Sequence, residues 1–221
     1  MISVAPASPD PPTAWDPPVF VRLGLCAAWS SHAAELAVPL GAQLERWPES
    51  PAVESMVRDG LLTRILPGVL MPPDLLSGAI SRVLALGCAL GEHLHSTQVV
   101  AGASAAWVLL GGTPPHPAEL LSSAHRMVLS GVVVRTARLL PREVETLGGA
   151  PLTVPTRTCV DLLRFAPAES AAALVGALLE SGHVTEAEIA GSLGRISSRH
   201  PGLAQARLRF ETLERTGTAA A

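Results

Sequence analysis

Proline and glycine divide the apolar part of this 221-residue chain into short pieces, and this limits what the chain can fold into. The sequence has 20 Pro and 19 Gly in a chain that is 48% apolar. The longest stretch without Arg, Asp or Glu, residues 93–118, is broken by six of these residues, so it cannot supply the roughly 20 continuous apolar residues of a membrane helix. We therefore expect a soluble protein with a real core, short elements and no membrane partner.

Charge and cysteine content exclude several classes of protein. All 16 basic residues are Arg, and with 19 acidic residues the net charge is -3. A strongly basic, histone-like protein is excluded, because neutralising DNA phosphates along the whole surface needs an excess of positive charge. The absence of Lys, Asn and Tyr is typical of a GC-rich genome. Cys26, Cys88 and Cys159 lie far apart and form no CxxC pair, which argues against a disulfide framework or a zinc site. We expect a cytoplasmic protein that holds no metal and no other cofactor.

The N-terminal part begins with a Pro-rich leader, residues 1–20, which has no signal-peptide pattern and is expected to be disordered. Helical spacing of apolar residues then predicts a helix within 21–38 and a second around 44–47. A third is predicted from 49 or 50 to 60, with Pro51 in its first turn.

After these helices the spacing of the apolar residues changes from a helical pattern to one typical of strands. Two β-prone runs, 62–66 and 69–71, flank Pro67 and Gly68, which predicts a hairpin. Helices followed by a hairpin favour a winged helix-turn-helix domain over residues 21–75. Any other small unit of helices and a hairpin fits the same pattern.

In the rest of the chain, segments with helical spacing of apolar residues alternate with segments that have strand-like spacing. The fold class we predict is therefore α+β: a winged helix-turn-helix followed by a mixed α/β domain with a helical C-terminal part. That second domain is expected over residues 76–215, with a tail at 216–221. Strands are predicted at 98–101, 127–129 and 132–134, the last two as a hairpin around Ser130-Gly131. Helices are predicted over 76–92, 105–110 with Ser104 as N-cap, 153–165, 168–180, from the Thr185-x-x-Glu188 capping box onward, and over 203–215.

Two short patterns resemble catalytic or metal-binding motifs only in part. Residues 102–106 resemble a nucleophile elbow around Ser104, but the second Gly is absent and no Asp-then-His order follows. His93 and His95 form an H-x-H pair without an acidic or Cys partner at ligand spacing. A helix cap and helix-end histidines explain these residues better, so we expect no enzymatic activity.

Arg157, Asp161 and Arg164 are spaced at i, i+4 and i+7, which places them on one face of the predicted helix. Such a row is either a structural ion-pair network or a set of arginines that faces a partner. The spacing does not decide between the two.

The distribution of Arg separates the two ends of the chain. Residues 1–59 carry three Arg against seven Asp and Glu, so DNA contact there depends on a few side chains. After residue 194, five Arg face two Glu, and this basic patch suits an acidic protein as well as nucleic acid. The five are Arg195, Arg199, Arg207, Arg209 and Arg215.

Four segments carry a family resemblance: VRDGLLTRILPGV at 57–69, VVAGASAAW at 99–107, GVVVR at 131–135 with LLP at 139–141, and GAPLTVPTRTCVDL at 149–162. In this order and spacing, over roughly residues 20–215, the chain resembles the AbiEi-type antitoxins that are common in actinobacteria. The segment from Arg157 to Leu162, after a Thr-x-Pro, is the most specific part of the resemblance.

The resemblance implies an N-terminal winged helix that binds operator DNA and represses its own bicistronic operon. In this interpretation we expect Arg46, Arg58 and Arg64 to contact the DNA. It also implies a C-terminal domain that acts against a nucleotidyltransferase-like toxin. The nuclease-like extension of many relatives is expected to be lacking. The alternative is an interaction module of the same fold that has lost DNA binding and neutralises or scaffolds a partner protein. The expected partner-binding or structural residues are Arg157, Asp161, Arg164, Arg195, Arg199 and Arg207.

Overall fold

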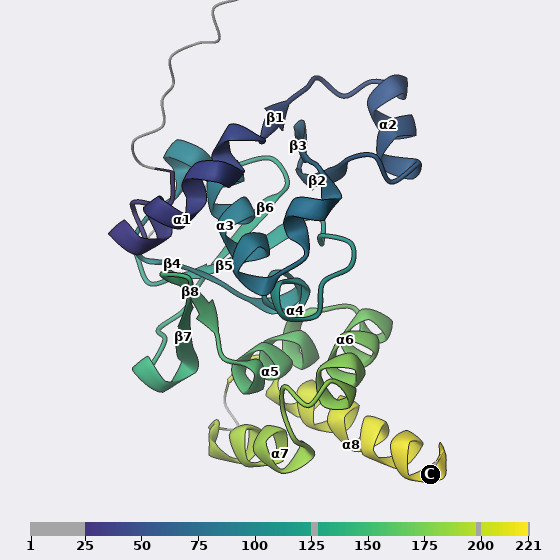
Figure 1. Cartoon of the computed structure of the whole chain (residues 1–221). Coiled ribbons are helices and arrows are strands. Elements are labelled where there is room, and N and C mark those ends of the chain that lie inside the picture. The colour runs from purple at the N-terminus through teal and green to yellow at the C-terminus, as the bar shows by residue number, and fades with distance from the viewer. Residues whose placement is uncertain (1–24, 125–127, 198–199, 221) are drawn as a thin grey trace, which may run out of the picture.

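The computed structural model describes residues 25–124, 128–197 and 200–220, and this part of the chain is a mixed α+β protein (Figure 1). The predicted α+β class is therefore confirmed. The predicted leader, residues 1–20, and the predicted site residue Arg199 lie outside these ranges. No helix within them is long and apolar enough to cross a membrane.

The N-terminal elements form a small three-stranded sheet with helices beside it. The elements are α1 (Ser31–Ala42), β1 (Glu45–Arg46), α2 (Pro51–Arg58), β2 (Thr63–Leu66) and β3 (Val69–Met71), with strand order β1-β3-β2. Helix α2 begins after Ser50, whose hydroxyl accepts a hydrogen bond from the Val53 amide at 3.3 Å, and the hairpin lies where it was predicted.

The prediction of a helix around 44–47 is wrong. Glu45 and Arg46 instead pair antiparallel with Leu70 and Val69 and form β1. The reason is tertiary: this pairing joins residues far apart in sequence, and such a contact overrides a weak local helical preference.

A five-stranded mixed sheet lies in the middle of the chain. Its strands are β4 (Gln98–Val100), β5 (Ala118–Ser122), β6 (Val132–Thr136), β7 (Val144–Leu147) and β8 (Ala150–Thr153), in the order β6-β5-β4-β8-β7. The pairs β5–β6 and β4–β8 are parallel, and the pairs β4–β5 and β7–β8 are antiparallel.

Two local predictions in this region are wrong. The hairpin predicted around Ser130-Gly131 is reduced, within the described residues, to an isolated antiparallel bridge between Leu129 and Val132, and β6 pairs in parallel with β5; Met127 of the predicted strand lies outside the described residues. Ser104 is not an N-cap, because α4 (Gly102–Leu110) begins two residues earlier, after Ala101. The buried Ser104 hydroxyl instead accepts a hydrogen bond from the Glu119 amide at 2.8 Å.

The described residues form two large hydrophobic cores and a small cluster of Val53, Leu62 and Leu70 beside α2. The first lies between α1, the small sheet, α3 (Ala79–Leu90) and the five-stranded sheet. The second is made by the C-terminal helices and by Ala106 of α4, so α4 contributes to both cores. Figure 1 shows these helices gathered at the end of the molecule away from α2. They are α5 (Pro155–Phe165), α6 (Ala168–Glu180), α7 (Glu186–Arg195) and α8 (Leu203–Ala220), and 3₁₀ turns lie at Pro73–Leu76, Gly91–His93 and Pro141–Glu143.

Candidate functional site

Helix α5 follows β8 after one residue and carries the most organised charge cluster. Pro155 occupies its first turn, and the Thr158 hydroxyl bonds the Thr153 hydroxyl at 2.7 Å, which fixes the helix against the end of the strand. Arg157 and Arg164 then lie along the side of α5 that faces the sheet edge and α7, where both line one cleft.

The ion-paired row predicted from the spacing is confirmed. Arg157 Nε lies 2.9 Å from Asp161 Oδ2, and Arg164 Nη1 lies 3.8 Å from Asp161 Oδ1. Asp161 is only 1% exposed, and its Oδ1 has no hydrogen-bond donor within the described residues. Burial raises the pKa of the Asp161 carboxyl and outweighs the attraction of Arg157. Burial also opposes the charge of Arg157, but Asp161 and Glu143 together raise the pKa of that guanidinium.

A second set of ion pairs lies beside this row. Arg157 Nη1 donates to Glu143 Oε1 at 3.0 Å, and Arg135 Nη2 donates to Glu119 Oε2 at 2.7 Å. Glu119 and Arg135 are diagonal neighbours on the same face of the parallel pair β5–β6, which brings the two side chains together.

Phe165 joins the two sets of charged residues. The guanidinium carbons of Arg135 and Arg164 lie 4.9 and 4.5 Å from the centre of its ring, within the range of cation–π interaction. The Phe165 side chain nevertheless remains 43% exposed at the end of α5.

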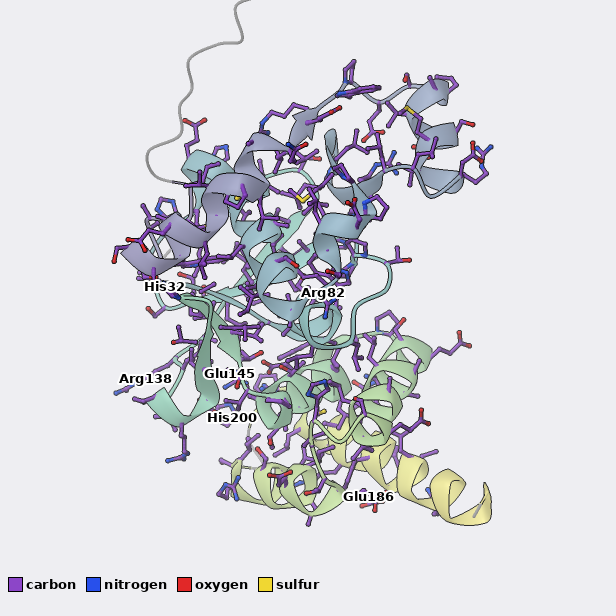
Figure 2. All side chains as sticks on the ribbon, in the orientation of Figure 1. His32, Arg82, Arg138, Glu145, Glu186 and His200 are labelled. Carbon is purple, nitrogen blue, oxygen red and sulfur yellow. The ribbon has the colours of Figure 1, made fainter. Side chains whose placement is uncertain are left out.

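These residues line a cleft of about 1330 Å³ between the edge of the five-stranded sheet, α5 and α7, here called the arginine cleft. Figure 2 shows two of its residues, Arg138 and His200, on the side of the molecule where β7 approaches α7. Six arginines line it: Arg135, Arg157 and Arg164, here called the inner arginines, and Arg138, Arg142 and Arg195, here called the outer arginines. The inner three are ion-paired, whereas the outer three are exposed and have no acidic partner in the described part of the chain.

The other arginines predicted near the C-terminus mostly stabilise helix ends. Arg207 donates to the Leu193 and Ile196 carbonyls at 3.0 and 3.4 Å, which caps the end of α7. Arg209 donates in the same way to carbonyls at the end of α5. Of this group, Arg195 is the described residue that lines the arginine cleft.

The three arginines predicted to contact DNA lie in different surroundings. Arg58 is exposed in the last turn of α2. The Arg64 side chain is 19% exposed, and its Nη2 lies 2.8 Å from Glu49 and 2.7 Å from Glu54. The Gly68 amide also donates to Glu49, and this hydrogen bond holds the pKa of the Glu49 carboxyl below its usual range. Two acidic side chains therefore neutralise Arg64.

Strand register separates Arg46 from Arg64. Arg64 is paired with Leu70, and Arg46 is paired with the next residue along β3, Val69. Neighbouring residues of a strand point to opposite faces, so the two guanidinium groups leave opposite sides of the small sheet. The Arg46 guanidinium lies over Gly91, which follows α3.

The potential metal ligands of the described residues are not clustered, and the three cysteines are buried. In the described residues, no group of three or more His, Cys, Asp and Glu side chains is arranged to hold a metal ion. Cys26, Cys88 and Cys159 are buried free thiols. Burial raises the pKa of Cys159 to about 12, which keeps this thiol protonated.

The sequence reasoning missed half of the arginine cleft. Arg135, Arg138 and Arg142 were not selected, although residues 135–142 contain three Arg and no acidic residue. That short basic run was the available signal. What the sequence did not indicate is that this run lies beside Arg157 and Arg164, because the strand order of the sheet brings them together.

Comparison with known proteins gives little further information. No protein-family model matches the chain, and no curated protein matches it. Among solved structures, the crystal structure of the RV2827C protein from Mycobacterium tuberculosis is similar at 18% identity and a TM-score of 0.42, covering 85% of this chain and 77% of that one. A likeness at this level assigns neither a family nor a function.

Proposed function

We propose that this protein is a non-enzymatic AbiEi-like antitoxin that also represses transcription of its own toxin–antitoxin operon by binding operator DNA. The observation that carries the proposal is the order of the N-terminal elements. Helix, strand, helix and hairpin follow one another, and β1 lies beside β3 in the order β1-β3-β2. This arrangement supports a winged helix-turn-helix, in which a helix enters the major groove of DNA and the hairpin contacts the backbone.

The resemblance to AbiEi-type antitoxins is consistent with where its segments lie. Segment 57–69 runs from the end of α2 through β2 to the first residue of β3, and segment 149–162 runs through β8 into α5. The first segment belongs to the proposed DNA-binding unit, and the second contributes to the arginine cleft. A nucleotidyltransferase-like toxin is the partner that the resemblance implies.

DNA binding by this unit depends on few positive charges. Arg58 is exposed on α2 and is the best placed of the three to contact phosphate. Arg64 contributes only if it leaves Glu49 and Glu54, and Arg46 projects from the other face of the small sheet. We therefore propose weak binding that falls steeply with salt.

An electrophoretic shift on the protein's own promoter fragment, measured across salt concentrations, tests the repressor function. A shift at low salt is expected, and Arg58→Gln should make the salt dependence shallower by about one unit of slope, because the variant neutralises one phosphate fewer. Arg215→Gln, on the exposed side of α8, is the matched control. Absence of any shift at low salt removes the repressor function.

A second candidate is an interaction module of the same fold that has lost DNA binding and neutralises or scaffolds a partner protein. The neutralisation of Arg64 by two glutamates favours this candidate. Co-purification with the product of the adjacent gene, together with no promoter shift at low salt, would select it. An adjacent gene that encodes a nucleotidyltransferase-like protein supports the antitoxin function in both cases.

A further inference from the structure

We propose that the arginine cleft is a binding site for single-stranded nucleic acid, separate from the DNA-binding unit at the N-terminus. The cleft has about 1330 Å³, which exceeds the roughly 300–1,000 Å³ of small-molecule pockets and suits a segment of a polymer. The proposal goes beyond operator binding, because it concerns other residues, another region of the molecule and another form of nucleic acid.

The inner arginines are held in fixed positions before any ligand arrives. Glu119, Glu143 and Asp161 pair with them, so their charges are balanced and their planar guanidinium groups are oriented. Oriented guanidinium groups match the bidentate geometry of phosphate and lose little further side-chain entropy on binding it. Of the three, Arg164 also donates through Nε and Nη2 to the Pro201 carbonyl at 3.1 and 2.9 Å.

The outer arginines supply the positive charge that a phosphodiester chain needs. Arg138, Arg142 and Arg195 come from the segment after β6, the turn before β7 and the end of α7, so they surround the cleft on two sides. Glu188 also lines the cleft, but its carboxylate accepts hydrogen bonds from the Thr185 amide and hydroxyl at 2.8 Å. The unpaired charge in the cleft is therefore mainly positive.

Phe165 distinguishes nucleic acid from an acidic peptide as the ligand. A peptide carboxylate requires only charge and hydrogen bonds, whereas a nucleobase gains by stacking on an aromatic ring or a guanidinium plane. The ring of Phe165 is exposed and has Arg135 and Arg164 against it, so phosphate-binding groups and stacking surfaces lie together.

The shape of the site indicates a single strand. Readout of a duplex requires a protruding helix or ribbon that enters a groove of the DNA. The arginine cleft is concave, and its arginines converge on the space between the sheet edge, α5 and α7. A single strand can lie in such a cleft with its backbone on the arginines and a base on Phe165.

Fluorescence anisotropy of the full chain with a labelled oligouridylate, and separately with an oligothymidylate, tests the proposal over about 50–200 mM salt. Binding of either probe is expected, and the difference between them shows whether RNA or DNA is preferred. The triple variant Arg138→Gln/Arg142→Gln/Arg195→Gln should make the salt slope shallower by about 2, because each phosphate contact on a single strand contributes about 0.7. Arg215→Gln, which lies on α8 outside the cleft, should bind as the wild type does.

Substitution of Phe165 separates stacking from charge. Phe165→Ala should weaken oligouridylate binding about tenfold, and Phe165→Trp should restore it, with thermal unfolding measured to show that both variants are folded. A polyglutamate competitor should displace the probe poorly. The proposal is overturned if neither probe binds, if the triple variant binds unchanged, or if polyglutamate competes fully while Phe165→Ala has no effect; the last result identifies an acidic-protein site.

The same variants distinguish this site from operator binding. The triple variant should still shift the promoter fragment, and Arg58→Gln should still bind oligouridylate. For the wild-type protein, oligonucleotide binding without a promoter shift contradicts the proposed repressor function, and a promoter shift without oligonucleotide binding contradicts the proposed cleft site.

Discussion

Arg82 is a charged residue whose environment is that of a structural group. Its side chain is 8% exposed inside the first core (Figure 2). Its Nε donates to the Val108 carbonyl at 2.9 Å, and its Nη1 and Nη2 donate to carbonyls of Leu76, Ser77 and Leu109. Burial lowers the pKa of Arg82, but the carbonyl groups at the end of α4 favour the charged form. The guanidinium therefore links α3 to the end of the 3₁₀ turn Pro73–Leu76 and to the end of α4.

Arg82→Met keeps much of the apolar stem and removes every donor. We expect it to lower the free energy of unfolding by about 3 kcal/mol, because several buried carbonyls lose their partner. Urea denaturation measures this change. Arg215→Met on the exposed side of α8 is the matched control and should stay within about 0.5 kcal/mol of the wild type. A decrease of under about 1 kcal/mol for Arg82→Met would contradict the structural role.

The glutamates around Arg64 give a second prediction at the residue scale. Glu49→Gln/Glu54→Gln removes two negative charges from the proposed DNA-binding unit and releases Arg64. The variant should bind the promoter fragment more tightly and with a salt slope steeper by about one, since one more guanidinium becomes available to phosphate. Stability should change by less than about 1 kcal/mol, because the two glutamates are largely exposed. Unchanged or weaker promoter binding would argue against a DNA contact by Arg64.

Local signals account well for several elements. Ser50 and Pro51 begin α2, Pro155 begins α5, and the Thr185 capping box begins α7, each as predicted. In α7, the Glu188 amide donates to the Thr185 hydroxyl at 3.3 Å, and the Glu188 carboxylate accepts from the Thr185 amide at 2.8 Å. Such signals can be identified in a sequence because both partners lie within one helical turn.

The capping box makes the start of α7 sensitive to acid. The hydrogen bond from the Thr185 amide lowers the pKa of Glu188 in the folded protein, so its contribution is present above the pKa of the unfolded chain. That contribution disappears as pH falls through the lowered pKa. Hydrogen exchange of the Thr185 amide should therefore accelerate in acid relative to the amides of α7. In Glu188→Gln the same amide should show no such relative change with pH, and equal behaviour of both proteins would contradict the assignment.

At the scale of the whole molecule, α4 connects the two cores. Trp107 and Val108 of α4 belong to the first core, and Ala106 belongs to the second. A single helix with side chains in both cores couples their stability, because neither core can lose α4 without exposing apolar surface of the other. The described part of the chain is therefore expected to unfold in one step.

Leu163→Ala tests this coupling. Leu163 is buried in the second core, and its truncation should lower the free energy of unfolding by about 2–5 kcal/mol. The described tryptophans, Trp29, Trp47 and Trp107, lie outside the C-terminal helices. Fluorescence and far-UV circular dichroism should therefore shift together in urea. A dichroism transition that precedes the fluorescence transition would show that the cores unfold independently.

The sequence by itself determined the α+β class, α2, the hairpin of β2 and β3, the helices from α5 to α7, and the ion pairs of Asp161. All of these rest on caps, turns or spacings within a few residues, where the chain closes contacts at little cost in entropy. Only the tertiary structure decided β1, the parallel pairing of β5 with β6, and the arginine cleft. These join distant segments, and the local sequence of each segment does not indicate its partner. Arg164 contacts Phe165 as its neighbour on α5, but Arg135 of β6 reaches the same ring only because the packing of the whole core brings the end of β6 to the end of α5.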